Sequence, residues 1–324
     1  MSGMKNLLFW LCALMIFIAG CAQQEDFPVL KGPYLGQKPP GMTPELFAPG
    51  IVSSKHQEHS SLSISSDGRE MWWSRWHLPL DTNKYPQVIM FIKYENGRWS
   101  QPKVAPFSGK YRDGGPAFSP NGNKIFFYSR RPLEEGTDEM HDNDIWYVER
   151  TQDGWSQPIN LGSKVNSPYV DATPSLAANG NLYFTSNRIQ YDDPTGNTDI
   201  FVSEFVDGDY TDPKGLGSAI NTPYARDCFP LIAPDERYII FSRDNRLFDT
   251  EGNVISGSIK LMISFKDNRG EWLEPVDMGP LFANTRFPSI SPDGKYLFFT
   301  KYTEGGHEDF YWVDARIIEQ LREE

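Results

Sequence analysis

The sequence predicts an all-β protein, a single β-propeller of four-stranded blades, and three observations support this prediction. A strand–turn–strand pattern occurs five times along the chain of 324 residues. Two further strand-like runs follow each of the first four copies, so that these units carry four strands, as a propeller blade does. Glycine (27 residues) and proline (25 residues) are frequent, which suits a fold with many tight turns.

The clearest copy of the repeat runs from Pro288 to Lys301. It contains a short strand, the turn Asp293-Gly294, and an apolar, aromatic strand. Asp-Gly between two apolar runs predicts a hairpin, because glycine accepts the positive φ that such turns need. The other copies are Leu62 to Arg75, Pro116 to Arg130, Pro174 to Arg188 and Pro230 to Arg243.

The turn positions give the period of the repeat. They lie 54, 58, 56 and 58 residues apart, at Asp67, Asn121, Asn179, Asp235 and Asp293. A fixed period of this size with strand-like segments indicates a propeller or a solenoid. In the second unit we expect the third strand at Asp144 to Arg150 and the fourth at Trp155 to Leu161. Pro158 in that fourth strand suits an outer edge, where a missing N–H costs little.

The fifth unit lacks a fourth strand. After Asp309 to Val313 the chain becomes helical, from Ala315 to Glu323. Pro44 to Val52 precedes the first unit in the way that Pro158 to Val165 precedes the third. We therefore expect the N-terminal strand to complete the last blade, which removes the open edges of the sheet. Five blades are favoured over six, because residues 22–56 are too few for a further blade.

The N-terminus is expected to be a targeting segment that lies outside the fold. Lys5 precedes an apolar run, Leu7 to Ala19, which is short for a membrane span, and small residues lead from this run to Cys21. The pattern resembles the lipobox of bacterial lipoproteins, and this resemblance implies cleavage before Cys21 and acylation of the cysteine. The alternative is an uncleaved anchor helix. Ala22 follows Cys21, and no aspartate signals inner-membrane retention, so we expect the outer membrane.

These observations divide the chain into four parts. We expect a lipoprotein signal peptide at 1–20, a lipidated tether at 21–41, the propeller at 42–314, and a helical tail at 315–324. The tether is expected because its residues are mostly proline, glycine and polar.

Composition argues against several classes of function. The formal net charge is −12, which argues against a nucleic-acid partner, because phosphate binding needs a basic surface. Cys12 leaves with the signal peptide and Cys21 carries lipid, so Cys228 has no intrachain disulfide partner and is expected to be buried. The sequence shows no zinc-type histidine spacing, no phosphate-binding glycine loop and no Ser-His-Asp signature. We expect a monomer without cofactor or metal.

Two acidic loops offer oxygen ligands of the kind that calcium prefers. They lie at 138–144 and 192–199. Neither matches the EF-hand spacing, and we interpret both as solvated loops.

The repeat resembles a known family. The runs that carry the resemblance are Trp155 to Gly162, Asn166 to Leu176 and Leu182 to Arg188. They are similar to the TolB-type, WD-repeat-like propeller repeat, especially to versions in bacterial envelope lipoproteins. The resemblance covers about residues 42–314 and implies envelope scaffolding, protein binding or a glycan-related role. The first unit departs from the pattern at Ser66 and at Trp72-Trp73.

Propeller geometry places the long loops of all blades on one face, and function concentrates on such loops. Charged residues recur on this face in two sets, which should ring the mouth of the central channel. The first set precedes the innermost strands: Glu58-His59, Arg112-Asp113, Asp171, Arg226-Asp227 and Arg286. The second set follows the second strands: Arg75, Arg130-Arg131, Arg188, Arg243 and Lys301.

Our first hypothesis is a lipid-anchored, non-enzymatic module that binds an envelope protein or glycan at this face. Arginine binds planar anions such as carboxylates by bidentate hydrogen bonds. The candidate ligand-binding residues are Glu58, His59, Arg75, Arg112, Asp113, Arg130, Asp171, Arg188, Arg226, Asp227, Arg243 and Arg286. The structural alternative is that these residues pair with one another as struts between blades.

A second hypothesis is a carbohydrate-active hydrolase. Asp113, Asp171 and Asp227 come from consecutive blades and could converge. Glycoside hydrolases use a pair of carboxylates, one as the acid and the other as base or nucleophile. The three aspartates also occupy equivalent repeat positions, which a purely structural repeat would explain without catalysis.

Overall fold

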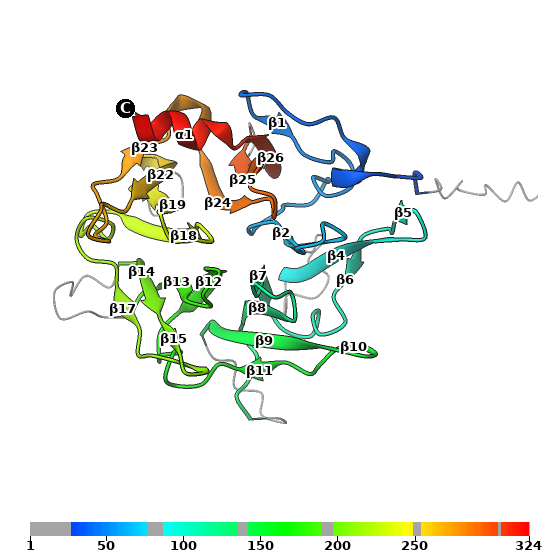
Figure 1. Ribbon diagram of the computed structural model, residues 1–324, viewed down its shortest axis with the longest axis horizontal. Coiled ribbons are helices and arrows are strands. Elements are labelled where there is room, and N and C mark those ends of the chain that lie inside the picture. Colours follow the sequence, from blue (N-terminus) through cyan, green and yellow to red (C-terminus); the bar gives the residue numbers. More distant parts are fainter. Residues whose placement is uncertain are drawn as a thin grey trace, which may run out of the picture.

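The computed structural model describes residues 27–76, 87–134, 142–188, 197–248, 254–303 and 306–323. These residues form a β-propeller of five antiparallel blades around a central channel (Figure 1). The all-β class, the five-blade count and closure by the N-terminal strand are confirmed. The predicted signal peptide and Cys21 lie outside the described residues.

The first three blades have the following strands, from the channel outward. Blade 1 contains β2 (Ser63–Ile64), β3 (Glu70–Trp76), β4 (Gln87–Glu95) and β6 (Lys103–Val104), with β5 (Arg98–Trp99) paired to β4. Blade 2 contains β7 (Asp113–Phe118), β8 (Lys124–Ser129), β9 (Asp144–Thr151) and β11 (Ile159–Asn160), with β10 (Gly154–Trp155) paired to β9. Blade 3 contains β12 (Asp171–Leu176), β13 (Leu182–Ser186), β14 (Asp199–Ser203) and β17 (Lys214–Gly215), with the hairpin β15 (Phe205–Val206) and β16 (Asp209–Tyr210).

The last two blades complete the ring. Blade 4 contains β18 (Arg226–Ile232), β19 (Tyr238–Asp244), β22 (Ile259–Phe265) and β23 (Val276–Asp277), with the hairpin β20 (Leu247–Phe248) and β21 (Val254–Ser256). Blade 5 contains β24 (Thr285–Ile290), β25 (Tyr296–Tyr302), β26 (Glu308–Asp314) and β1 (Glu45–Leu46). Three short helices lie outside the blades: η1 (Pro33–Gly36), η2 (Pro280–Phe282) and α1 (Arg316–Glu323).

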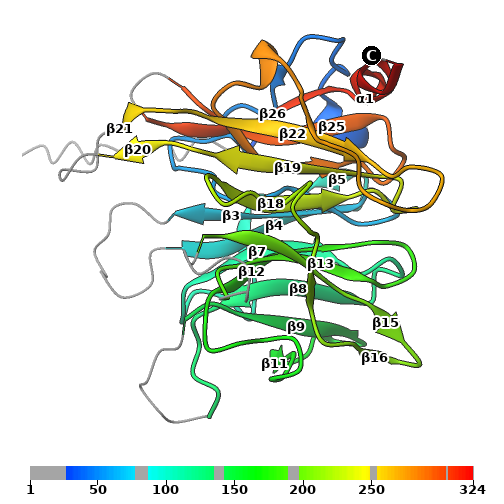
Figure 2. The ribbon, with the colours of Figure 1, turned by 90° about the vertical axis from the view of Figure 1, so that its left-hand side faces the viewer.

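The propeller has two faces, which we name by their connections. The turn face carries the turns between first and second strands and the β15–β16 hairpin. The loop face carries the connections between second and third strands, including the β20–β21 hairpin. Figure 2 shows these two hairpins projecting from opposite sides of the molecule.

The outermost strands are shorter than the sequence predicts. In the second unit the expected fourth strand divides into β10 and β11, and Pro158 lies between them. In the other blades Pro102, Pro213 and Pro275 likewise stand directly before β6, β17 and β23. Proline has no N–H for the ladder, so the paired part of each outer strand begins just after it.

Apolar clusters fill the space between adjacent blades. Successive residues of a strand face opposite sides of the sheet. In β8, Phe126 therefore packs with Leu182 of blade 3, whereas Phe127 packs with Trp72 of blade 1. The same alternation produces the remaining inter-blade clusters, so the second and third strands of each blade supply both neighbouring interfaces.

The first strands of blades 2 to 5 each contain a bulge, where the pairing register shifts just before the repeated proline. The bulged residues have positive φ: Gly115 (60°), Thr173 (51°), Phe229 (57°) and Phe287 (53°). The N–H of Gly115 donates to Ser74 Oγ, and that of Phe229 donates to Thr185 Oγ1, each at 2.9 Å. The acceptors belong to the second strand of the preceding blade, so these bulges tie neighbouring blades together.

The N-terminal strand closes the ring. Glu45 pairs with Trp312 and Leu46 pairs with Tyr311, and Phe47 is fully buried against Phe298 and Trp312.

Residues 27–41, which belong to the predicted tether, pack on the propeller. The N–H of Trp99 donates to Leu30 O at 3.0 Å, and its indole N–H donates to Gly32 O at 2.8 Å. Tyr34 contacts the rings of Tyr296 and Trp312.

The C-terminal helix α1 matches the predicted helical tail. Ile317 and Ile318 pack into the cluster between blades 4 and 5. Asp314 caps the helix by accepting the N–H of Arg316 at 2.9 Å. No helix within the described residues is long and apolar enough to cross a membrane.

Candidate functional site

Each of the first four blades holds one buried carboxylate–arginine pair at the loop face. In blades 2 to 4 the carboxylate lies where the first strand begins, whereas Glu58 lies five residues before β2. The arginines lie at or just beyond the end of the second strand. The pairs are Glu58–Arg75 (3.0 Å), Asp113–Arg131 (2.8 Å), Asp171–Arg188 (2.6 Å) and Asp227–Arg243 (2.7 Å). All four carboxylate residues have 0% exposure.

The pair in blade 3 shows the arrangement. Arg188 donates to Asp171 Oδ1 at 2.6 Å and to the carbonyl of Val165 at 2.7 Å. Ser167 donates to Asp171 Oδ2 through both its N–H and its hydroxyl. Asp113 and Asp227 likewise accept from Ser108 and Thr222, which precede them by five residues. Each pair thus joins the first strand, the second strand and the loop from the previous blade.

The structural alternative of our sequence analysis needs one correction. The pairs do not run between blades, because both charged residues belong to the same blade. Only the second hydrogen bond of each guanidinium reaches the inter-blade connection, as Arg188 does at Val165 and Arg243 does at Ile220 (2.8 Å).

Burial is the largest influence on the pKa of two of these carboxylates. Burial raises the pKa of Asp113 and of Asp227, and the hydrogen bonds from Arg131 and Arg243 oppose this rise. A catalytic carboxylate must reach the group that it protonates or attacks. Asp113, Asp171 and Asp227 are covered and saturated by protein donors, so their geometry favours a structural role.

Blade 5 replaces this pair with Thr285 and Lys301. The position of the buried carboxylate holds Thr285, whose hydroxyl donates to Phe282 O at 2.5 Å, and Lys301 Nζ lies 3.5 Å from Leu281 O. The strong ion pair of this blade lies nearer to the channel, between Arg286 and Glu308.

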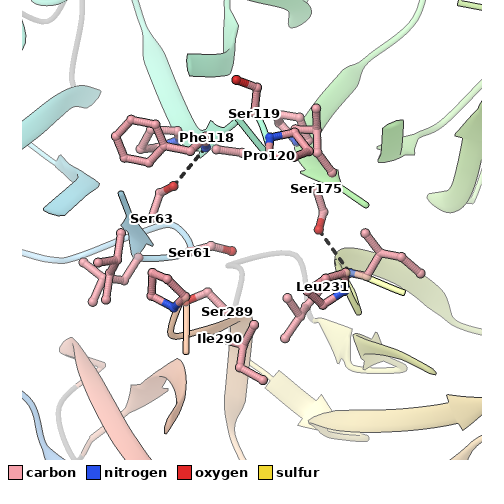
Figure 3. Close-up of a pocket in the computed structure, with 18 of the residues that line it drawn as sticks. Ser61, Ser63, Phe118, Ser119, Pro120, Ser175, Leu231, Ser289 and Ile290 are labelled. Carbon is pink, nitrogen blue, oxygen red and sulfur yellow. Dashed lines mark hydrogen bonds between the residues drawn. The ribbon is translucent and has the colours of Figure 1, made fainter. Parts of the chain in front are cut away.

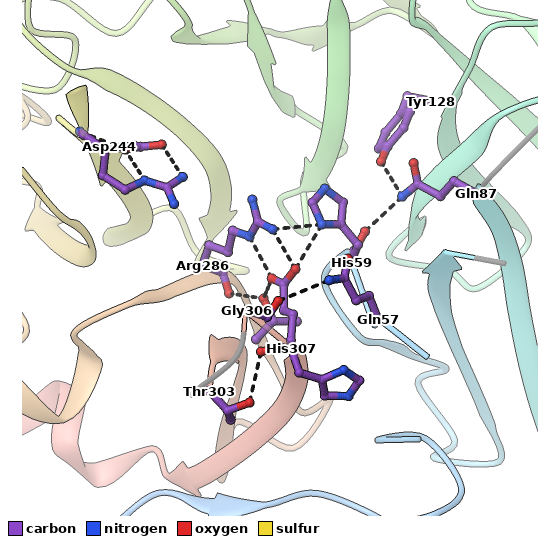
Figure 4. A network of polar contacts seen from close by, with 12 residues as sticks. Gln57, His59, Gln87, Tyr128, Asp244, Arg286, Thr303, Gly306 and His307 are labelled. Carbon is purple, nitrogen blue, oxygen red and sulfur yellow. Dashed lines mark hydrogen bonds and ion pairs between the residues drawn. The ribbon is translucent and has the colours of Figure 1, made fainter. Parts of the chain in front are cut away.

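Glu308 is 1% exposed and is the centre of a polar network, of which Figure 4 labels Arg286 and His59. Arg286 forms a bidentate pair with it, Nε–Oε1 at 2.7 Å and Nη2–Oε2 at 2.6 Å, and Thr300 donates to Oε1 at 2.5 Å. His59 Nδ1 lies 3.0 Å from Oε2 and 2.9 Å from Arg286 Nη2. The network joins blade 5 to blade 1.

The charges in this network shift its pKa values. Burial raises the pKa of Glu308, but Arg286 and His59 outweigh burial and hold that pKa at about 2. Burial lowers the pKa of His59, and the neighbouring Arg286 lowers it further. At neutral pH the Glu308–Arg286 pair is therefore ionised and internally neutral.

Arg112 stands in different surroundings. Its Nε donates to Gln87 Oε1 at 3.2 Å, and its Cζ lies 5.1 Å from the centre of the Trp76 ring. Gln87 in turn donates to Tyr128 Oη at 2.9 Å and to the carbonyl of His59 at 3.0 Å. Figure 4 shows Gln87 and Tyr128 beside His59. Within the described chain, no carboxylate forms an ion pair with Arg112.

Arg226, which holds the position of Arg112 in blade 4 and is the first residue of β18, provides a contrast. It pairs with Asp244 at 2.6 Å, and Asp244 also binds Arg246 at 2.9 Å. Arg130 lies farther out, near Asn143 Oδ1 (3.3 Å) and Asp142 (4.0 Å). Ten of the twelve candidate residues therefore fall into the buried pairs, the Glu308 network, and the open cation Arg112. Arg130 and Arg226 lie outside these three groups.

Sequence reasoning missed Glu308, Trp76, Gln87 and Tyr128. Glu308 had a signal, because acidic residues also begin the third strands of blades 2 and 3, at Asp144 and Asp199. Trp76, Gln87 and Tyr128 had no such signal. The sequence does not show whether a side chain in a second or third strand faces the channel or a neighbouring blade. The described residues contain no cluster of three or more His, Cys, Asp or Glu side chains suited to a metal ion, and the acidic loops at 138–144 and 192–199 lie largely outside them.

Comparison with known proteins gives matches among solved structures. No protein-family model matches the sequence, and no curated protein matches it. A candidate TolB from Agrobacterium tumefaciens is 18% identical over 80% of this chain and 75% of its own, with a TM-score of 0.48. The chain is also similar to a periplasmic gluconolactonase from Pseudomonas aeruginosa, with 14% identity over 78% of this chain and 70% of the other and a TM-score of 0.41. A GH43 endo-arabinanase from Bacillus licheniformis is 12% identical over 80% of this chain and 94% of its own, with a TM-score of 0.45. The propeller assignment itself stands on the sheet order of this chain.

Proposed function

We propose that this protein is a lipid-anchored, non-enzymatic binding module of the bacterial cell envelope. Its loop face binds a carboxylate of an envelope protein or glycan, and Arg112 makes the central contact. The lipid anchor and the outer-membrane location are proposed from the lipobox pattern that ends at Cys21.

The lack of an ion-paired carboxylate for Arg112 among the described residues carries the proposal. Burial lowers the pKa of Arg112, and the nearby positive charge of Arg130 lowers it further. A partly buried guanidinium is costly without an anion to offset its lost hydration. The other arginines of the channel mouth have such an anion: Arg286 has Glu308, and Arg226 has Asp244.

The surroundings of Arg112 suit a planar anion. Gln87 and the Trp76 ring fix the guanidinium at its Nε edge and on one face. The two terminal nitrogens make no hydrogen bond with any described residue. Arginine binds a carboxylate through such a pair of parallel N–H groups, and the fixed plane reduces the entropy lost on binding.

The hydrolase hypothesis receives less support. It needs two carboxylates that can reach one substrate bond. Asp113, Asp171 and Asp227 each have 0% exposure and are held by arginine. No observation at the loop face favours it over binding.

A capture experiment tests the proposal. The chain from residue 22 onward, immobilised, is incubated with envelope extract, and the captured material is examined for protein and for glycan. Arg112→Met should lose the ligand, because the guanidinium is gone while the packing on Trp76 is kept. Arg188 is unsuitable for this test, since its loss would leave Asp171 unpaired.

Arg316→Met is the matched control. Arg316 lies on α1 with its side chain 77% exposed, and its replacement should leave capture unchanged. Equal capture by Arg112→Met and the unaltered chain would contradict the proposed site. Cleavage of an envelope polysaccharide by the unaltered chain, lost in Asp171→Asn without loss of folding, would support the hydrolase instead.

The anchor is tested separately. Cys21→Ser removes the thiol that the lipid would modify, so the protein should move from the detergent-soluble membrane fraction to the aqueous fraction. Retention of the Cys21→Ser protein in the membrane fraction would indicate an uncleaved N-terminal helix.

A further inference from the structure

The turn-face end of the central channel forms a second recess, which we call the cup (Figure 3). The cup has a volume of about 330 Å³ and is lined by the ends of the five innermost strands and by the turns that follow them. This volume is at the lower end of the range for small-molecule sites. The cup does not depend on the proposed function, since Arg112 lies at the opposite end of β7.

The lining of the cup has no charged side chain, although 23% of the chain is charged. Seven of its residues are prolines, and most of the others are serine, leucine or isoleucine. A charged ligand would lose its hydration here without gaining a counter-charge. The lining therefore favours an uncharged ligand that presents C–H groups to the proline rings.

The walls of the cup also offer hydrogen bonds. The N–H of Phe118 donates to Ser63 Oγ at 3.1 Å, and the N–H of Ile232 donates to Ser175 Oγ at 3.0 Å. Figure 3 shows these two bonds on opposite sides of the cup. In each case the serine hydroxyl of one blade accepts a backbone N–H of the next blade. That N–H belongs to the residue two positions after the repeated proline.

The other three blade junctions lack this bond. In blade 2 the position of the serine holds Ala117, which cannot accept a hydrogen bond from the N–H of Leu176 in blade 3. In blade 4 it holds Leu231, which cannot accept from the N–H of Ile290 in blade 5. In blade 5 it is Ser289, which is 9% exposed and whose hydroxyl has no hydrogen-bond partner among the described residues. Leu176 and Ile290 are partly exposed and line the cup. A ligand in the cup can therefore accept from their N–H groups and supply the partner that a buried hydroxyl such as that of Ser289 normally has.

We propose that the cup binds one uncharged sugar residue. A pyranose ring supplies hydroxyl oxygens for the backbone N–H groups of Leu176 and Ile290, and a partner for Ser289. Its C–H faces pack on the proline rings, and a single ring suits the volume. The sugar is either a free monosaccharide or the end residue of a neutral glycan.

Saturation-transfer NMR on the purified chain tests this proposal with defined probes. Glucose and N-acetylglucosamine should receive saturation, whereas glucuronate and glucosamine, which carry charge, should not. Maltotriose distinguishes the two sources: tighter binding than glucose indicates a glycan end, and equal binding indicates a free monosaccharide.

Two variants locate the binding. Ala117→Leu fills part of the cup without removing a hydrogen bond and should weaken binding at least tenfold. If that variant fails to fold, Ala117→Ser serves instead, because its hydroxyl can accept from Leu176 in place of the sugar. Arg316→Met, on the exposed side of α1, should bind sugar normally. The proposal is overturned if no neutral sugar receives saturation, if glucuronate binds as well as glucose, or if the folded Ala117 variants bind unchanged.

Discussion

Arg188 and Arg316 form ion pairs of nearly equal length, 2.6 and 2.7 Å, in very different surroundings. Asp171 is fully buried under Arg188, whereas the side chain of Arg316 is 77% exposed. Removing one partner of a buried pair costs about 3–5 kcal/mol, because a charge remains without compensation. An exposed pair contributes less than about 1 kcal/mol.

We therefore expect Arg188→Met to lower the free energy of unfolding by about 3–5 kcal/mol, and Arg316→Met to change it little. Urea unfolding of the two variants measures the difference. Similar losses in both would show that the buried pair is not a structural support.

Glu308 makes stability depend on acid pH. Its pKa in the folded chain is about 2, below the ordinary value of 4.5. The ionised carboxylate thus stabilises the fold fully above pH 4.5, and this contribution disappears as the pH falls toward about 2. The shift corresponds to about 3 kcal/mol across that window.

The variant Glu308→Gln should accordingly show a shallower loss of stability between pH 4.5 and about pH 2. Chemical unfolding at several pH values measures the slope, with Glu319→Gln on α1 as control. An unchanged slope in Glu308→Gln would mean that the Arg286 pair does not shift the carboxylate.

Gly114 is required by its neighbours rather than by its backbone angle. A Cβ atom at this position would lie 2.4 Å from the ring of Tyr128 and 2.8 Å from Gln87 Nε2. We expect Gly114→Ala to destabilise the fold by about 1–3 kcal/mol, since the buried ring must move. Gly41→Ala, where no atom lies within 4 Å, should change the melting temperature little. A tolerated Gly114→Ala would show that the Tyr128 ring moves freely.

At the scale of elements, the closing strand β1 depends on one side chain. Phe47 is fully buried and contacts the rings of Phe298 and Trp312, at 5.0 and 5.1 Å between centres. Phe47→Ala should cost about 3–5 kcal/mol, the usual value for a buried phenylalanine. Phe205→Ala, in the exposed β15–β16 hairpin, is the control. A small loss for Phe47→Ala in calorimetry would show that blade 5 is stable without its outer strand.

The sequence predicts these elements unevenly. Asp293-Gly294 and the apolar run after it locate β24 and β25, because turn chemistry and alternation are local properties. The bulges at Thr173, Phe229 and Phe287 have no such signal, since positive φ is unusual for these residues. Their positions are fixed by contacts between blades, which only the assembled ring provides.

The candidate site is predictable to a similar degree. The repeat correctly predicts that the arginines and acidic residues lie on one face, because their spacing along the chain matches the period of the blades. The partner of each arginine depends on the register between strands, so Arg131 rather than Arg130 meets Asp113. Glu308 lies on a third strand, outside both repeated sets. Arg112 is distinguished only by its lack of an ion pair with a carboxylate of the described residues.

At the scale of the whole molecule, the ring is stabilised by repetition of one interface. Each blade buries its two faces against its neighbours, and a single apolar cluster lies at each junction. The loop face and the cup are formed by all five blades together. A local change in one blade is therefore expected to affect both ends of the channel only through the stability of the ring.

The pairing of Glu45 with Trp312 also sets an order in time. Whether the chain leaves a ribosome or a membrane pore, β1 emerges first and its partner strand emerges among the last residues. At about 5–20 residues per second, a ribosome needs roughly 15–50 s to make the intervening chain. During this interval the ring is open, and Phe47 and the inner edges of the blades have no permanent partner. Chaperones and proteases that inspect a nascent chain would meet this protein mainly in that period.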